Sequence, residues 1–106
     1  PNYKKRNEVT KAEYVKNSYW MPTIVPDEKL NLNRSKIIKD LDLKGIKLRP
    51  FFYPISSCPE FNANVVNNLS IQLGKNGINL PSYYDMSNED VAYISDNIIN
   101  YFENEK

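Results

Sequence analysis

The chain has 106 residues, 41% hydrophobic and 25% charged, a composition typical of one soluble globular domain. Its formal net charge is only +1, with acids and bases interspersed, which disfavours a dedicated nucleic-acid surface. It contains no histidine and a single cysteine, Cys58, which excludes imidazole-based catalysis, a zinc site and an internal disulfide. No apolar run approaches the roughly 20 residues of a membrane span, and no signal-peptide pattern opens the chain. We therefore expect a cytoplasmic protein without a membrane partner and, because it begins at Pro1 rather than Met, a piece of a longer one.

The chain is predicted to open with a polar lead-in over residues 1–17, which are weakly patterned. Residues 18–25 are rich in aromatic and β-branched side chains, which favours a strand. Pro22 and Pro26 punctuate this segment, and because proline cannot donate to a sheet ladder, we expect an edge or irregular strand. The predicted small domain therefore spans residues 18–106.

A first helix is predicted over residues 34–43, where apolar residues recur at helical spacing. Asn33 can cap this helix by accepting a backbone N–H bond, and Gly45 provides the stop. Residues 46–52 are predicted to form a strand, because Ile46 and Leu48 alternate with Lys47 and Arg49, the period of a half-buried strand. Two prolines, at positions 50 and 54, turn it into a stiff extended segment.

Two further helices and a short strand complete the predicted domain. Residues 63–73 carry apolar side chains on one helical face, and residues 78–80 read as a short strand stopped by a proline. Ser87 and Asp90 have the spacing of a capping box and open the clearest helix. Its buried stripe should consist of Val91, Ile94, Ile98 and either Tyr101 or Phe102.

The order of these elements predicts a small α+β two-layer domain, in which helices pack over a sheet of about three strands. Two sequence blocks in it are distinctive: residues 45–54 read Gly-Ile-Lys-Leu-Arg-Pro-Phe-Phe-Tyr-Pro, and residues 77–82 read Gly-Ile-Asn-Leu-Pro-Ser. Met-Ser-Asn-Glu-Asp-Val follows at residues 86–91, and Asn-Ser-Tyr-Trp-Met precedes at residues 17–21. In sequence, order and spacing these segments resemble the C-terminal domain of DegT/StrS-type aminotransferases, and the resemblance covers nearly the whole chain.

This resemblance implies a fold-type-I parent enzyme that uses pyridoxal 5′-phosphate, is usually a homodimer and moves an amino group from glutamate to a nucleotide-linked keto sugar. Such enzymes contribute to the synthesis of cell-surface polysaccharides. In the family, the Schiff-base lysine, the aspartate that pairs the pyridine nitrogen and the phosphate-holding groups all lie in a large N-terminal domain. The resemblance therefore implies that this chain binds no cofactor by itself, does not catalyse transamination alone, and has the N-terminal large domain as its partner.

Three residues are the predicted substrate contacts: Arg49, Tyr53 and Ser56. The family's segment at this position lies at the rim of the active site, and the planar guanidinium of Arg49 suits a carboxylate or a phosphate. It therefore holds either the donor's carboxylate or the nucleotide-sugar, unless it pairs with a structural carboxylate such as Asp42. Tyr53 offers a hydroxyl that needs a partner. At Ser56 many family members have a histidine instead, so this chain departs from the family by offering a hydrogen bond without acid–base chemistry.

Several nearby residues are predicted to be structural. Phe51 and Phe52 are each expected to lie in the core, and the core is also favoured for Tyr19 and Trp20 over a dimer surface. Cys58 has no basic neighbour in sequence and is expected to be an inert structural thiol.

Two other functions remain open at this point. One is a free-standing α+β binding or regulatory module of ferredoxin-like type, in which the aromatic residues 51–53 stack RNA bases. The flanking prolines and the low net charge count against it. The other is a purely structural dimerisation domain, which a stable dimer of the isolated chain would support.

Overall fold

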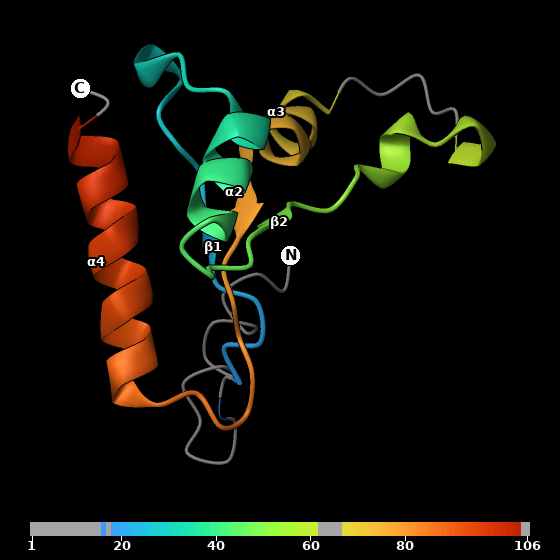
Figure 1. Cartoon of the computed structure of the whole chain (residues 1–106). Helices are drawn as coiled ribbons and strands as arrows, with labels where there is room; N and C mark the ends of the chain where they lie inside the picture. Colours follow the sequence, from blue (N-terminus) through green and yellow to red (C-terminus); the bar gives the residue numbers. More distant parts are fainter. Residues whose placement is uncertain (1–15, 17, 62–66, 105–106) are drawn as a thin grey trace.

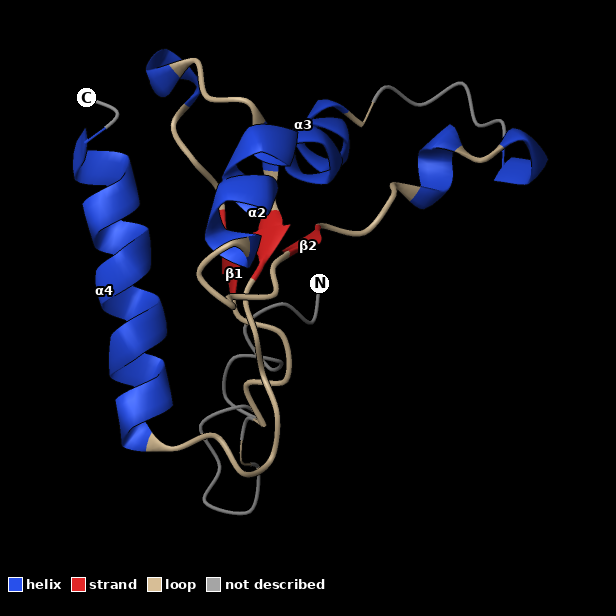
Figure 2. Ribbon diagram, viewed as in Figure 1, coloured by secondary structure: helices blue, strands red, loops and turns tan. Residues whose placement is uncertain are grey.

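The computed structural model describes residues 16, 18–61 and 67–104. Strands and helices alternate in the predicted order, with three short 3-10 turns between them (Figures 1 and 2). The bounds are β1 Thr23–Ile24, η1 Glu28–Leu30, α2 Arg34–Asp42, β2 Arg49–Pro50, η2 Ile55–Ser57, η3 Pro59–Phe61, α3 Asn68–Asn76, β3 Ile78–Asn79 and α4 Asn88–Asn104.

The sheet has three antiparallel strands in the order β1-β3-β2, so the last strand in sequence lies in the centre. Thr23 and Arg49 are the partners of Asn79 on its two sides. Asn79 is buried, and its side chain joins the three strands. The Thr23 hydroxyl donates to its Oδ1 at 2.8 Å, and its Nδ2 donates to the Pro50 carbonyl at 3.5 Å. A polar group in the sheet is thereby satisfied from both edges.

The core lies on one face of the sheet, where α2 and α4 meet β3. Ile78 of β3 is fully buried and packs in one cluster with residues of both helices and of the segment before β2. Burial of this apolar surface is the main driving force for the fold. The predicted two-layer α+β architecture is therefore confirmed. The buried residues of the cluster are Ile37, Leu41, Ile46, Leu48, Ile78 and Ile98.

The helix ends follow the predicted capping chemistry. The Asn33 side chain accepts a hydrogen bond from the Lys36 amide at 3.1 Å, as expected for an N-cap. Gly45 ends the turn after α2 with φ of +78°, a left-handed conformation that favours glycine. At α4, the Ser87 amide donates to Asp90 Oδ2 at 3.1 Å and the Asp90 amide donates to Ser87 Oγ at 3.0 Å. The two bonds form the reciprocal capping box that the sequence predicted.

Several predicted boundaries are wrong. The strands expected over 18–25 and 46–52 shrink to two residues each, because prolines at positions 22 and 50 lack the N–H that a longer ladder needs. Within the described residues α3 begins at Asn68 and continues past the predicted end at position 73, and residues 62–66 lie outside the described part. Val91 was assigned to the buried stripe of α4, yet it is 48% exposed, although it lies on the same helix face as the buried Ile98 seven positions later.

The capping box makes the stability of the domain depend on pH in the acidic range. Hydrogen bonds from the Ser87 hydroxyl and amide and from the Tyr83 hydroxyl hold the pKa of Asp90 below its ordinary 3.8. The folded carboxyl therefore binds a proton less readily than the unfolded one, and the stabilisation is complete above pH 3.8 and lost as pH falls through the folded pKa. We expect Asp90→Asn to flatten the decline of the thermal midpoint between about pH 5 and pH 2. Asp96→Asn, an exposed change in the same helix, is the control, and an equal slope in both variants contradicts the prediction.

Candidate functional site

The predicted site residue Arg49 lies in edge strand β2, opposite Asn79 of the central strand. Directly paired residues of an antiparallel sheet point to the same face, so Thr23, Asn79 and Arg49 form one row across the sheet. Ile78, in the alternate register position, packs in the helix-covered core. Arg49 therefore belongs to the sheet face opposite α2 and α4.

The Arg49 side chain is exposed and forms no hydrogen bond or ion pair with the described residues. The carboxylate considered as its structural partner, Asp42, pairs instead with Lys47. A guanidinium presents five N–H donors in a fixed fork that matches a carboxylate or phosphate. Arg49 is thus available to an anion without breaking any contact in the described part of the domain.

After β2 the chain leaves the sheet as a projecting arm, residues 51–61, which is extended at first and then contains the turns η2 and η3 (Figure 1). The arm begins by crossing the C-terminal end of α3. The Phe51 amide donates to the Gly77 carbonyl at 2.9 Å, and a Cβ added at Gly74 would lie 2.7 Å from Pro54 Cδ. Only a glycine at position 74 lets the proline pack this closely without a shift, so α3 fixes the direction in which the arm departs.

Aromatic rings gather where the arm leaves the sheet. Trp20 stacks on Phe52 with ring centroids 6.4 Å apart, and Phe51 meets Phe52 edge-on at 5.6 Å. The expectation that these rings lie in the core is wrong for Trp20, Phe52 and Tyr19, which are 66%, 54% and 76% exposed. Phe51 is half-buried and lies outside the buried cluster. The rings pack on one another instead, at a surface that the described chain leaves open to solvent.

The other two predicted contacts follow along the arm. Tyr53 is 72% exposed. Ser56 lies in η2, and its Oγ is buried without a hydrogen-bond partner among the described residues. A buried hydroxyl that lacks a partner costs about 1–3 kcal/mol, and in this conformation the chain itself closes Ser56 Oγ off from solvent. The structure thus arranges Arg49, Tyr53 and Ser56 in sequence along one projecting segment and does not gather them around an enclosed pocket.

Sequence reasoning missed two residues of this region, Thr23 and Asn79. Asn79 lies between Ile78 and Leu80, and a single polar residue in a short apolar strand could have indicated a side chain with a specific hydrogen-bonding role. Pairing of β1 with β3 joins positions 56 residues apart, which no local pattern reveals.

Comparison with known proteins identifies the origin of this arrangement. The DegT/DnrJ/EryC1/StrS aminotransferase family matches residues 2–99, nearly the whole chain. The chain belongs to this aminotransferase family. The expectation drawn from the blocks at residues 45–54 and 77–82 is thereby confirmed.

Among curated proteins, the aminotransferase chain is similar to GDP-perosamine synthases from three bacteria. It is 33% identical over 90 residues to that of Caulobacter vibrioides, 33% over 88 residues to that of Vibrio cholerae, and 34% over 86 residues to that of Escherichia coli O157:H7. Each match covers 80% of this chain but only 23–24% of the relative. The chain spans about a quarter of the length of the relatives it matches.

The described residues do not fit the family's cofactor, pyridoxal phosphate, on their own. A lysine that forms a Schiff base is normally desolvated or set beside another cation, so that it loses its proton readily. Every lysine in residues 16, 18–61 and 67–104 is solvent-exposed. Over the same residues, no group of three metal-ligating side chains comes together, and no helix is long and apolar enough to cross a bilayer. We therefore assign no cofactor chemistry to these residues.

Proposed function

We propose that this chain is the C-terminal small domain of a pyridoxal-phosphate-dependent aminotransferase, and that it forms the substrate-binding rim of that enzyme. The parent enzyme moves an amino group from glutamate to a keto sugar linked to a nucleotide. The observation that carries the proposal is Arg49, an exposed guanidinium without a partner among the described residues, on a segment that the family shares. The cofactor is held by the rest of the parent, and the isolated chain is inactive.

In this proposal the large N-terminal domain of the parent covers the aromatic surface. Trp20 and Phe52 stack on each other at the surface, and Tyr53, Ile55 and Phe61 are further exposed apolar side chains of the arm. Contiguous exposed apolar surface of this kind usually marks an interface. Docking of the large domain, and of a second subunit in a homodimer, would bury it.

Arg49 in β2 and the two arm residues Tyr53 and Ser56 have different parts in substrate binding. Arg49 binds an anionic group, either the carboxylate of the amino donor or a phosphate of the nucleotide-sugar. Tyr53 offers an exposed hydroxyl for a hydrogen bond to substrate, and Ser56 offers one once its side chain turns outward from its buried position. None of the three moves a proton at neutral pH, because a serine replaces the family's histidine. In this proposal the acid–base groups therefore belong to the rest of the cytoplasmic parent.

The first test is the DNA upstream of the codon for Pro1. The proposal expects an open frame of a few hundred codons in phase, encoding an α/β domain with a Ser-x-x-Lys segment and an aspartate before it. The complete product is then assayed for transfer of the amino group from glutamate. The names of the similar proteins make formation of GDP-perosamine the first reaction to try.

A start codon directly before Pro1 would contradict this proposal, because the domain would then act without a cofactor-binding partner. The exposed Trp20, Phe52 and Tyr53 rings would in that case favour the binding module, since such rings stack on unpaired bases. Salt-sensitive RNA affinity of the isolated chain separates the two functions, because the small domain of an aminotransferase has no reason to bind RNA.

A further inference from the structure

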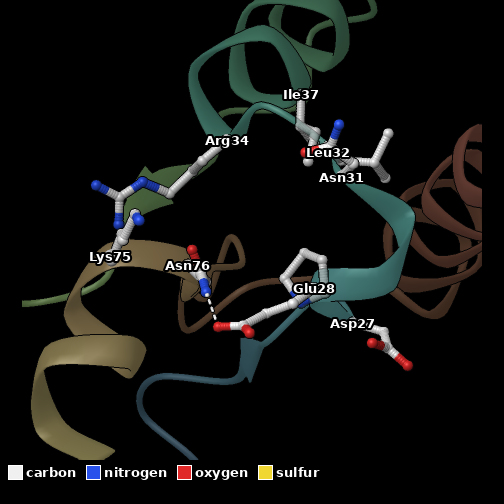
Figure 3. A pocket seen from close by; sticks show the side chains of 9 residues that line it. Asp27, Glu28, Asn31, Leu32, Arg34, Ile37, Lys75 and Asn76 are labelled. Atoms are coloured by element: carbon white, nitrogen blue, oxygen red, sulfur yellow. Dashed lines mark hydrogen bonds between the residues drawn. The ribbon is translucent and has the colours of Figure 1, made fainter. Parts of the chain in front are cut away.

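A polar cavity lies away from Arg49, where the η1 turn, the first turn of α2 and the last turn of α3 meet (Figure 3). Its volume is about 290 Å³, and a second hollow beside it shares several of the same lining residues. None of Arg49, Tyr53 and Ser56 lines it. The residues that matter for its chemistry are Glu28, Arg34, Lys75 and Asn76.

Arg34 is held in place by the end of α3. Its Nη1 donates to the Gly74 carbonyl at 2.6 Å and to the Gly77 carbonyl at 3.4 Å. These bonds occupy one of the three guanidinium nitrogens and leave Nε and Nη2 without a protein acceptor among the described residues. Arg34 is half-buried, yet no carboxylate of the described chain pairs with it. Its charge is therefore balanced in the described chain only by the partial negative charge of the α3 C-terminus and not by a carboxylate.

Lys75 adds a second unpaired cation to the same cavity. It lines both hollows together with Arg34, and Figure 3 draws the two cationic ends on one side. Within residues 16, 18–61 and 67–104 Lys75 forms no ion pair. Arg34 and Ser35, in the first turn of α2, line the second hollow, and the positive end of the helix dipole adds to the potential there. The C-terminal dipole of α3 offsets part of this charge, but it supplies no oxygen to the free nitrogens of Arg34.

The acidic groups stand apart from this cationic side. Glu28 lies across the cavity and accepts a hydrogen bond from the Asn76 side chain at 3.1 Å (Figure 3). Asp27 accepts the Lys29 amide at 2.9 Å as the cap of η1, and Figure 3 shows it directed away from Arg34. The cavity therefore has one cationic end with two side-chain charges and an acidic wall lined by Glu28 and Asp27, of which Glu28 faces the cations.

We propose that this cavity is a binding site for a phosphate monoester, with the dianionic phosphate between Arg34 and Lys75. Two cationic side chains and helix N–H groups match a dianion better than a singly charged carboxylate, and the free edge of the guanidinium allows bidentate contact. The rest of the ligand lies toward Glu28 and carries hydroxyl or amino groups that can donate to it. The site is independent of the proposed aminotransferase role.

The test uses the 106-residue chain and inorganic phosphate as the probe, at low ionic strength and pH 7.5. Two-dimensional NMR should show saturable shifts of the amides of residues 34–35 and 74–77, with a dissociation constant on the order of millimolar. Lys75→Gln should weaken phosphate about tenfold, the loss of one charge-assisted contact. Lys39→Gln removes an exposed charge of α2 that does not line the cavity and should leave the affinity unchanged.

A substitution of Glu28, on the wall that faces the two cations, should change the phosphate affinity in the other direction. Glu28→Gln removes the facing negative charge but keeps an acceptor for Asn76, and it should tighten phosphate binding about threefold. Unsaturable shifts, or equal losses in Lys75→Gln and Lys39→Gln, would mean that phosphate responds only to overall charge and would overturn the proposal. Weaker binding in Glu28→Gln would overturn the proposed orientation of the site.

Discussion

Replacing Arg49 by glutamine in the proposed parent enzyme should lower kcat/KM about a hundredfold, because charge-assisted hydrogen bonds to an anionic substrate contribute roughly 1.5–3 kcal/mol. The side chain is exposed and contacts none of the described carboxylates, so the change should leave folding unaffected. The loss should therefore appear in kinetics and not in the thermal midpoint. Steady-state assays with each substrate varied in turn identify its ligand, because KM rises most for the substrate that Arg49 binds.

Two companion variants define the chemistry at this position. Arg49→Lys keeps the charge but loses the planar fork, and it should recover only a small part of the lost activity if contact is bidentate. Lys47→Gln removes a neighbouring exposed cation that pairs with Asp42, and it should leave kcat/KM within about twofold of the parent. Arg49→Gln activity indistinguishable from that of Lys47→Gln would remove Arg49 from the substrate site.

Truncation of Ile78 should be the most damaging single change to the fold. Ile78 is fully buried in the central strand and belongs to the cluster that joins the sheet to α2 and α4. Ile78→Ala should destabilise the domain by about 3 kcal/mol, and Ile78→Val by about 1 kcal/mol. Since small domains are stable by only about 5–15 kcal/mol, the alanine variant loses a large fraction of the total.

Urea unfolding of the chain, followed by circular dichroism, measures both variants. Ile99→Ala is the matched control, because Ile99 is also an isoleucine but half of its side chain is exposed on α4. It should cost clearly less than Ile78→Ala. Equal losses at the two positions would mean that the buried cluster does not dominate the stability of the domain.

The features of the fold that were predicted correctly are formed by residues close together in the sequence. The Asn33 cap and the Ser87–Asp90 box are satisfied within three positions along the chain, so their spacing alone identifies them. The strands were predicted too long because strand-favouring side chains continue on both sides of prolines that cannot donate to the ladder. Their order in the sheet was not predictable from local pattern at all, since it depends on pairing over long separations.

The candidate site was predictable as a segment but not as a surface. The sequence block that resembles the family was enough to predict the segment that contains Arg49, Tyr53 and Ser56. The exposure of Trp20 and Phe52 was missed because aromatic residues are usually buried, and here the described chain supplies no layer to cover them. Arg34 was overlooked because its role arises from the carbonyls of residues 74 and 77, which lie 40 or more positions away.

The central position of β3 also bears on how the domain forms during synthesis. Both edge strands precede their only partner, and Thr23 pairs with a residue 56 positions later. A chain emerging from the ribosome therefore carries two unpaired strand segments until residues 78–79 are released, and α4, which covers the sheet, is made last of all. The domain cannot fold progressively from its N-terminus, and we expect its sheet and core to assemble in one late step.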